Sequence, residues 1–211
     1  MRFSTAGIRG SIRRPRPAGR DAESEPGPPL TVARVGLPRT RRVLGRRDVA
    51  LAYNRVIIPS LVIDHSELRL RQRGVAGHEG FLLWAGSLAG GDAFVSTIVT
   101  PGVEAGRLHG QVSPQTAARA FDELDHLDLV PIAQVHTHPE QAFLSATDAQ
   151  RPMVAADGFL SIVIPSFGFV DLADVGVWRA YEFHGREQWR ELSDGERSER
   201  LIVDPSLITI S

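Results

Sequence analysis

The sequence predicts an α/β fold of the α+β type, in which helices flank one mixed β-sheet. Apolar runs of strand length alternate along the chain with segments of helical periodicity. Two of these runs surround a glycine-rich turn, which indicates antiparallel pairing. Strands and helices otherwise interleave, so the sheet should combine both strand directions.

The first expected elements are a strand followed directly by a helix. Residues 55–59 form a short apolar run, which we predict to be an edge strand. Apolar residues placed among charges predict a helix over residues 60–73. Gly74 is expected to end that helix, because glycine is common just beyond a helix C-terminus.

A hairpin is the next expected element. Residues 80–88 and 93–100 are apolar runs on either side of the Gly90-Gly91-Asp92 turn. Residues 101–112 carry turn-forming residues and predict a loop. Ser113-Pro114 then predicts a helix start, with serine as the N-cap and proline at the first helical position.

The rest of the chain continues the alternation of strands and helices. The expected elements are a buried strand at 129–135, a short helix after Ser145, strands at 158–165 and 174–184, one short C-terminal helix and a β-prone segment at 201–203. Together with the hairpin they complete the predicted mixed sheet.

Two residue types are missing from the 211 residues. The chain has no cysteine, and all 24 of its basic residues are arginine, so it has no lysine. The missing cysteine excludes disulfides, thiolate nucleophiles, iron–sulfur clusters and thiolate zinc sites. The missing lysine excludes Schiff-base chemistry, P-loops and protein-kinase sites. Any catalysis must therefore use His, Asp, Glu, Ser, Thr, Tyr or a metal.

Charge divides the chain into two parts. Residues 1–47 hold 12 arginines against three acidic residues, a net charge of +9, whereas residues 48–211 carry −10. We predict a disordered or loosely ordered Arg/Pro-rich segment at 1–47 and one folded domain at 48–211. Three interpretations of the basic segment stay open: an arm for an acidic partner, a transit peptide, or the arginine bias of a GC-rich gene.

The apolar runs also bear on location. The longest, such as residues 81–86, are far too short to cross a bilayer. No apolar stretch of signal-peptide length follows the first arginines. We therefore expect a cytoplasmic protein with no membrane partner. The acidic charge of residues 48–211 disfavours nucleic acid as a partner of the domain.

Two histidines stand out near the end of a predicted strand. His136 and His138 are two positions apart, so they point to the same face of a strand and can share one cation. Pro139 follows at once and ends the strand, which places the pair where sites tend to open. The opposing interpretation is that such a pair arises by chance or makes hydrogen bonds in the core.

Three further residues extend this group. Asp148 falls in the first turn of the next predicted helix and can turn its carboxylate toward the histidines, which would leave a fourth tetrahedral zinc position open for water. Ser145 precedes it by three residues, which also fits a capping box. Glu79 lies between glycines at the entry to the hairpin, where it could act as a general base or simply be solvated.

In this order, Glu79, His136-x-His138-Pro139 and Ser145-x-x-Asp148 resemble the JAMM motif of the JAB1/MPN/Mov34 metalloprotease family. The resemblance covers about residues 55–184 and looks most like the prokaryotic JAB branch. One difference is that six residues separate His138 from Ser145, one fewer than in the familiar eukaryotic pattern. The resemblance implies that residues 48–211 form an MPN-type domain with a cytidine-deaminase-like mixed β-sheet flanked by helices.

The same resemblance implies an activity. It assigns zinc (Zn²⁺) to His136, His138 and Asp148, the general base to Glu79, and an oxyanion or water hydrogen bond to Ser145. The implied substrate is the bond after the C-terminus of a ubiquitin-like protein, cut in deconjugation or in precursor trimming. E1-like and E2-like proteins of the same operon are the implied partners, in a setting such as antiviral defence.

Other functions remain open at this point. A RadC-like protein of DNA metabolism would suit the basic segment, although the acidic domain disfavours it. A non-catalytic MPN scaffold usually lacks motif residues, and this chain has all five. A peptidase for free peptides, or a processor of sulfur-carrier precursors, would use the same chemistry. The genes that neighbour this one would separate these alternatives.

Overall fold

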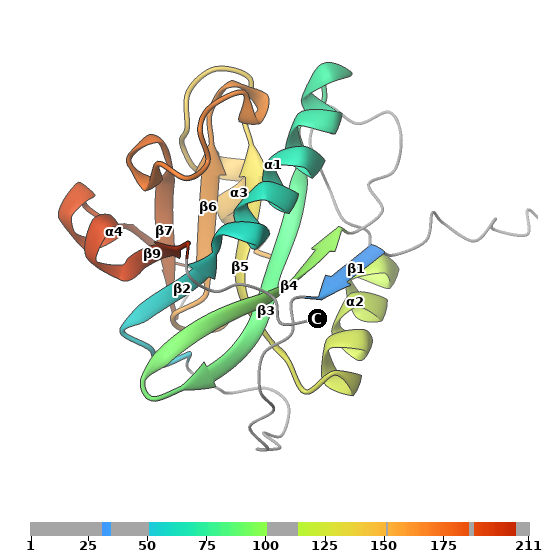
Figure 1. Ribbon diagram of the computed structural model, residues 1–211, viewed down its shortest axis with the longest axis vertical. Coiled ribbons are helices and arrows are strands. Elements are labelled where there is room, and N and C mark those ends of the chain that lie inside the picture. The colour runs from blue at the N-terminus through green and yellow to red at the C-terminus, as the bar shows by residue number, and fades with distance from the viewer. Residues whose placement is uncertain (1–30, 35–50, 101–113, 151, 186–187, 206–211) are drawn as a thin grey trace, which may run out of the picture.

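In the computed structural model, described over residues 31–34, 51–100, 114–150, 152–185 and 188–205, nine strands form one sheet (Figure 1). The strands are β1 (Thr31–Arg34), β2 (Arg55–Pro59), β3 (Phe81–Ala89), β4 (Asp92–Thr100), β5 (Val130–Thr137), β6 (Leu160–Ile164), β7 (Arg179–His184), β8 (Gln188–Glu191) and β9 (Leu201–Asp204). The helices are α1 (Ser60–Val75), α2 (Pro114–His126), α3 (Ala146–Gln150) and α4 (Asp194–Arg200), with short 3-10 turns η1 (Ser166–Gly168) and η2 (Val175–Val177).

The sheet is mixed, which confirms the predicted fold class. Its strand order is β8-β7-β6-β5-β3-β4-β2-β9, and β1 pairs with β4 off this path. The β5–β6, β2–β4 and β2–β9 pairs are parallel, and the other pairs are antiparallel. Each of the three parallel pairs joins strands with a helix between them in sequence, as parallel connections require.

The predicted hairpin is the centre of the sheet. β3 and β4 pair antiparallel from Leu83 opposite Val99 to Ala89 opposite Asp92. The turn between them places Gly90 at φ 61° and Gly91 at φ 84°. Two successive positive φ angles are what a two-residue hairpin turn needs, and glycine adopts them without steric cost.

The prediction of an edge strand at residues 55–59 is wrong. β2 has the predicted bounds, but it lies between β4 and β9, and β9 occupies the edge. Four of its five residues are buried, as expected for a strand covered on both faces. The partner β9 begins at Leu201, far along the chain, so no local sequence pattern predicts this pairing.

Helix α1 has a different end from the one predicted. It runs to Val75, so Gly74 lies inside it and is buried. A Cβ at Gly74 would come within 2.7 Å of the Cβ of Phe167. Gly74 therefore allows η1 to pack closely on the helix, and the chain turns instead at Gly77, whose φ is 70°.

Several later boundaries also shift. The strand expected at 174–184 begins only at Arg179, because residues 175–177 form η2. Strand β8 was not predicted. The C-terminal helix α4 and β9 match expectation, and α4 begins with a capping box between Ser193 and Glu196.

The core lies between the sheet and α1. Trp84 of β3 is fully buried, donates a 2.9 Å hydrogen bond from its indole N–H to Ser66 of α1, and meets Trp178 edge to face. Helix α2 begins at Pro114 as predicted and buries Ala120 and Leu124. Figure 1 shows α1 crossing in front of the sheet, which curls so that β9 and α4 approach β7.

The segment expected to have little order contains one strand. β1 pairs with β4 antiparallel, from Thr31 opposite Thr100 to Arg34 opposite Thr97. These four residues are thus paired in the sheet. The rest of 1–47, the loop at 101–112 and the Ser113 N-cap lie outside the described residues. In the described part of the chain, no helix is long and apolar enough to cross a membrane.

Candidate metal centre

Strand β5 brings the two histidines together. His136 lies inside the strand and His138 follows its last residue, with the two ring centroids 5.2 Å apart. The backbone N–H of His138 donates to the carbonyl of Ile164 at 2.9 Å, which continues the strand geometry past Thr137. Both histidine side chains are 7% exposed, so they face the same buried side, as the i, i+2 spacing predicts.

Helix α3 adds the carboxylate. Asp148 lies in its first turn, and its Oδ2 is 3.6 Å from Nε2 of His136 and 3.5 Å from Nε2 of His138. One ligand atom from each of the three residues can be chosen so that all lie within 4.8 Å of one another. Among the described residues, they form the one group of three or more His, Asp or Glu side chains that could hold a cation.

Ser145 forms a capping box with Asp148. Its Oγ accepts the backbone N–H of Asp148 at 3.2 Å, and Asp148 Oδ2 accepts the backbone N–H of Ser145 at 3.0 Å. The hydroxyl of Ser145 also donates to Oδ2 at 2.6 Å. The capping interpretation of Ser145 is therefore confirmed, and the capped carboxylate is the one that faces the histidines.

The surroundings of Asp148 keep it ionised. Burial raises the pKa of this carboxyl, but the neighbouring imidazoles of His136 and His138 and the hydroxyl of Ser145 outweigh that effect and leave the pKa well below its ordinary value. An ionised carboxylate is the form that binds a cation, so this residue can serve as a metal ligand at neutral pH.

Glu79 reaches the same place from the start of β3. The backbone N–H of Gly80 donates to Oγ1 of Thr137 at 2.7 Å, and the N–H of Thr137 donates to the carbonyl of Gly80 at 3.0 Å. Thr137 lies between the two histidines in sequence, so this pair of hydrogen bonds holds the backbone beside Glu79 close to them. A Cβ at Gly80 would come within 2.8 Å of Leu70, which explains glycine at that position.

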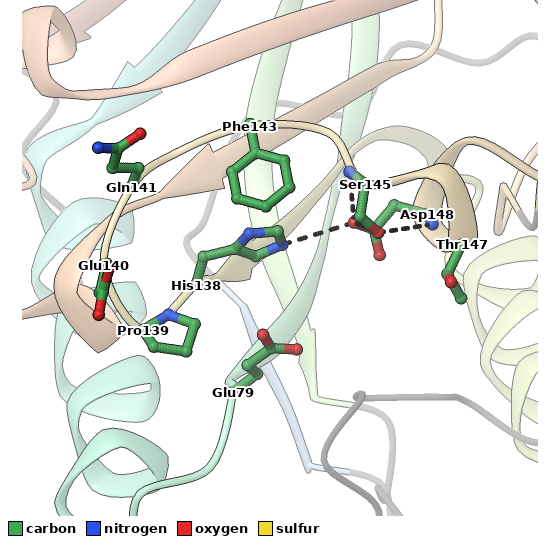
Figure 2. Close-up of a pocket in the computed structure, with 9 residues that line it drawn as sticks. All are labelled: Glu79, His138, Pro139, Glu140, Gln141, Phe143, Ser145, Thr147 and Asp148. Atoms are coloured by element: carbon green, nitrogen blue, oxygen red, sulfur yellow. Dashed lines mark hydrogen bonds and ion pairs between the residues drawn. The ribbon is translucent and has the colours of Figure 1, made fainter.

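A pocket of about 490 Å³ opens over these residues. Figure 2 shows the Glu79 carboxylate turned toward the His138 ring, and a dashed line joins that ring to Asp148, beside Ser145. The lining consists of Glu79, His138, Pro139, Glu140, Gln141, Phe143, Ser145, Thr147 and Asp148. The proposed base, one histidine and the ionised carboxylate thus share one solvent-accessible cavity.

The state of His136 tests whether a metal fits. Both ring nitrogens of His136 are buried, and neither has a hydrogen-bond partner in the described structure. An unsatisfied buried polar group is costly, and the 3.6 Å separation from Asp148 is too long for a hydrogen bond. A cation bound at Nε2 would remove that cost, so the donor set of two imidazoles and one carboxylate fits a metal.

Other residues near the site carried no clear sequence signal. Phe143, 51% exposed, meets the ring of His138 edge to face at 4.7 Å and lines the pocket. The indole N–H of Trp189, on β8, donates to the carbonyl of Ala149. The other described histidines lie outside the cluster.

Comparisons with known proteins find a sequence relative and solved structures of similar fold. A protein of Sinorhizobium fredii named "Probable metalloprotease" is 29% identical over 154 residues, which cover 70% of this chain and 93% of that protein. The solution structure of a protein from Desulfitobacterium hafniense has a TM-score of 0.52 at 16% identity and covers 72% of this chain and 94% of its own, which shows a shared fold.

A JAB1/MPN domain protein from Archaeoglobus fulgidus has a TM-score of 0.40 at 13% identity and covers 70% of this chain and 98% of its own. No family model matches the chain. The five motif residues are in the expected order, and three of them, His136, His138 and Asp148, converge on one point beside a cavity that Glu79 and Ser145 also line. This arrangement and the relative named a probable metalloprotease agree with the resemblance to the JAB1/MPN/Mov34 (JAMM) metalloprotease family.

Proposed function

We propose that the protein is a zinc-dependent peptidase or isopeptidase that hydrolyses the bond after the C-terminus of a ubiquitin-like protein. The observation that carries the proposal is the convergence of His136, whose buried ring nitrogens make no hydrogen bond, with His138 and the ionised Asp148 at the edge of an open pocket. Buried polar groups are usually hydrogen-bonded, and a cation bound at His136 would take the place of the missing bond.

His136, His138 and Asp148 would hold the zinc. Two neutral imidazoles and a carboxylate are the three protein ligands typical of catalytic zinc, which leaves a coordination position open. Zinc bound there would supply Lewis acidity, which lowers the pKa of water and polarises a carbonyl oxygen. Structural zinc sites usually have four protein ligands that include cysteine, and the chain contains no cysteine. A donor set of two histidines and one aspartate therefore fits a catalytic zinc better than a structural one.

Glu79 is the proposed proton carrier. Its carboxylate lines the pocket that His138 and Asp148 also line, and the Gly80–Thr137 bonds hold its backbone in place. In this role it accepts the proton of the attacking water and passes it to the leaving amine. Because the same carboxylate both takes up and delivers the proton, it acts as a proton carrier and not as a ligand of the metal.

Ser145 has two proposed tasks. Its hydroxyl holds Asp148 in the orientation that faces the histidines. The hydroxyl also borders the pocket, and rotation away from Asp148 would let it donate to the oxyanion that forms on the substrate.

The substrate class follows from the family resemblance and agrees with the shape of the site. A pocket of about 490 Å³ that is open to solvent has room for an extended chain terminus. Pro139 and Phe143 offer apolar contacts to such a segment, and Glu140 and Gln141 offer polar ones. A folded ubiquitin-like domain would stay outside while its flexible C-terminal residues reach the metal.

Cleavage of matched substrates tests this proposal. The purified chain with bound zinc is incubated with a ubiquitin-like protein that carries a C-terminal extension, with the same protein joined to a lysine side chain, and with a free peptide of the extension sequence. We expect mass spectrometry to show cleavage after the ubiquitin-like C-terminus in the first or second substrate. Cleavage of the free peptide alone would contradict the proposed substrate class, and no cleavage of any substrate would contradict the activity.

A further inference from the structure

Helix α3 has little of its own to hold it in place. It has only five residues, and none of them is buried. A helix this short has no stability in isolation. Because it buries none of its residues, its own packing contributes little to holding it in place. Yet it carries Asp148, whose carboxylate must stay within reach of two histidines fixed on the central sheet.

The capping box does not solve this problem. The bonds between Ser145 and Asp148 are local, so they shape the first turn of the helix but do not attach it to the sheet. Contacts that fix the helix relative to β5 must come from residues far away in the sequence. The described hydrogen bonds include one such contact to the helix itself.

That contact comes from the edge strand β8. The indole N–H of Trp189 donates to the carbonyl of Ala149 at 3.2 Å, and Ala149 is the residue after Asp148. The Trp189 ring is half-buried and meets Phe183 edge to face at 5.2 Å, and the two residues are cross-strand neighbours. The donor is therefore held by the sheet, on a side chain with little rotational freedom.

A second link acts after the helix. The backbone N–H of Met153 donates to Oε1 of Gln134, on β5, at 3.1 Å. The segment after α3 is thus attached to the sheet, and Trp189 attaches the helix itself.

We propose that Trp189 is a positioning residue for the metal centre: its indole N–H holds the Ala149 carbonyl so that Asp148 faces His136 and His138. This inference rests on the proposed metal site. Residues that orient a metal ligand typically change metal affinity by about 10- to 100-fold when they are replaced. We expect a value near tenfold for the loss of this one bond between neutral groups.

The test replaces the indole without removing the ring contact. Trp189→Phe keeps an aromatic side chain against Phe183 and deletes the donor. Trp178→Phe is the matched control, because the Trp178 indole nitrogen is buried and has no hydrogen-bond partner within the described residues. The zinc affinity of each full-length variant is measured by competition with a chromophoric chelator, and the thermal stability of each metal-free form is measured alongside.

We expect zinc to bind Trp189→Phe about tenfold more weakly than wild type, and to bind Trp178→Phe within twofold of wild type, whatever the change in stability. Equal affinities of wild type and Trp189→Phe would overturn this inference and leave the metal site intact. An equal loss in both variants would also overturn it, since the effect would then be general destabilisation.

Two further outcomes are decisive. If Trp189→Phe does not fold, Trp189→Leu, which also removes the indole donor at this half-buried position, is measured in its place: weaker zinc binding supports the inference, and wild-type affinity overturns it. If the wild-type chain itself binds no zinc, both the proposed function and this inference are wrong. Failure of the inference alone is thus distinguishable from failure of the metal site.

Discussion

The hydroxyl of Ser145 donates a 2.6 Å hydrogen bond to Oδ2 of Asp148, the oxygen that also lies 3.5 Å from Nε2 of His138. One serine therefore caps a helix and orients the carboxylate of the proposed metal ligand Asp148. Because both tasks use the same oxygen of Asp148, the local folding of α3 and the assembly of the site are coupled.

This coupling predicts the effect of Ser145→Ala. Loss of the cap should lower the free energy of unfolding by about 1 kcal/mol. Loss of the bond that orients Asp148 should in addition weaken zinc binding by about tenfold. Chelator competition and urea unfolding measure the two effects separately.

Ser193→Ala is the control for that variant. Ser193 makes the same capping box with Glu196 at the start of α4, away from the site. It should lose a similar amount of stability and keep the zinc affinity of wild type. If Ser193→Ala lost as much zinc affinity as Ser145→Ala, general loss of helix capping, and not the orientation of Asp148, would explain the weaker binding.

Glu79→Gln should separate catalysis from metal binding. An amide of the same shape cannot accept the proton of water, so the rate constant of cleavage should fall by about 10²- to 10⁴-fold. Zinc content should stay at the wild-type value, because Glu79 lies outside the group of ligands. Glu140→Gln, at an exposed carboxylate of the same pocket, should keep the rate within a few-fold. Full activity of Glu79→Gln would exclude Glu79 as the base.

Thr137→Val tests how Glu79 is held. The buried Thr137 hydroxyl accepts the backbone N–H of Gly80, and valine has the same shape without that acceptor. The Gly80 N–H, left without an acceptor, should lower the free energy of unfolding by about 2 kcal/mol. Because Glu79 would be held less firmly, kcat should fall by a larger factor than KM changes. Thr137→Ser restores the acceptor and should recover most of kcat. If Thr137→Val turned over substrate at the wild-type rate, the Gly80 bond would have no part in placing Glu79.

Glu182 is predicted to stabilise the fold in a pH-dependent way. Burial raises the pKa of its carboxyl, but hydrogen bonds from Arg200 at 2.6 Å and Arg190 at 3.0 Å lower it more, so the net pKa lies below its ordinary value. Glu182→Gln should therefore reduce the free energy of unfolding at pH 7 by about 2 kcal/mol. Glu191→Gln, whose side chain is 49% exposed, should cost less than about 0.5 kcal/mol.

The sign of the pH effect follows from that lowered pKa. The contribution of Glu182 is fully present above the unfolded pKa of a glutamate, about 4.3, and is lost as the pH falls through the lower folded value. Urea unfolding of wild type and Glu182→Gln across this range should show the two stabilities converging on the acid side. A difference that stays constant down to the lowest pH at which both fold would show that the charge of Glu182 is not responsible.

The part of the site that could be predicted from sequence is the part made by short-range geometry. Strand periodicity places His136 and His138 on one face, and helix capping places Asp148 three residues after Ser145. The approach of Glu79 depends on the pairing of β3 with β5, which places Phe81 opposite His136 and which the sequence analysis did not predict.

What sequence could not supply depends on pairing between distant segments. Strand β8 has four residues, most of them exposed, so it shows neither an apolar run nor a clear alternation. Its Trp189 could be interpreted only as a packing residue, because the Ala149 carbonyl it binds lies 40 positions away. Likewise, β2 looked like an edge strand because its neighbour β9 comes from the far end of the chain.

The central claim is that His136, His138 and Asp148 hold a metal on which hydrolysis depends. Its most direct test is the rate at which the wild-type chain cleaves a ubiquitin-like fusion, measured as purified, after removal of metal by a chelator, and after addition of one equivalent of zinc. The account predicts that activity disappears with the metal and returns with zinc. Cleavage at the full rate by chain shown to be metal-free would contradict it.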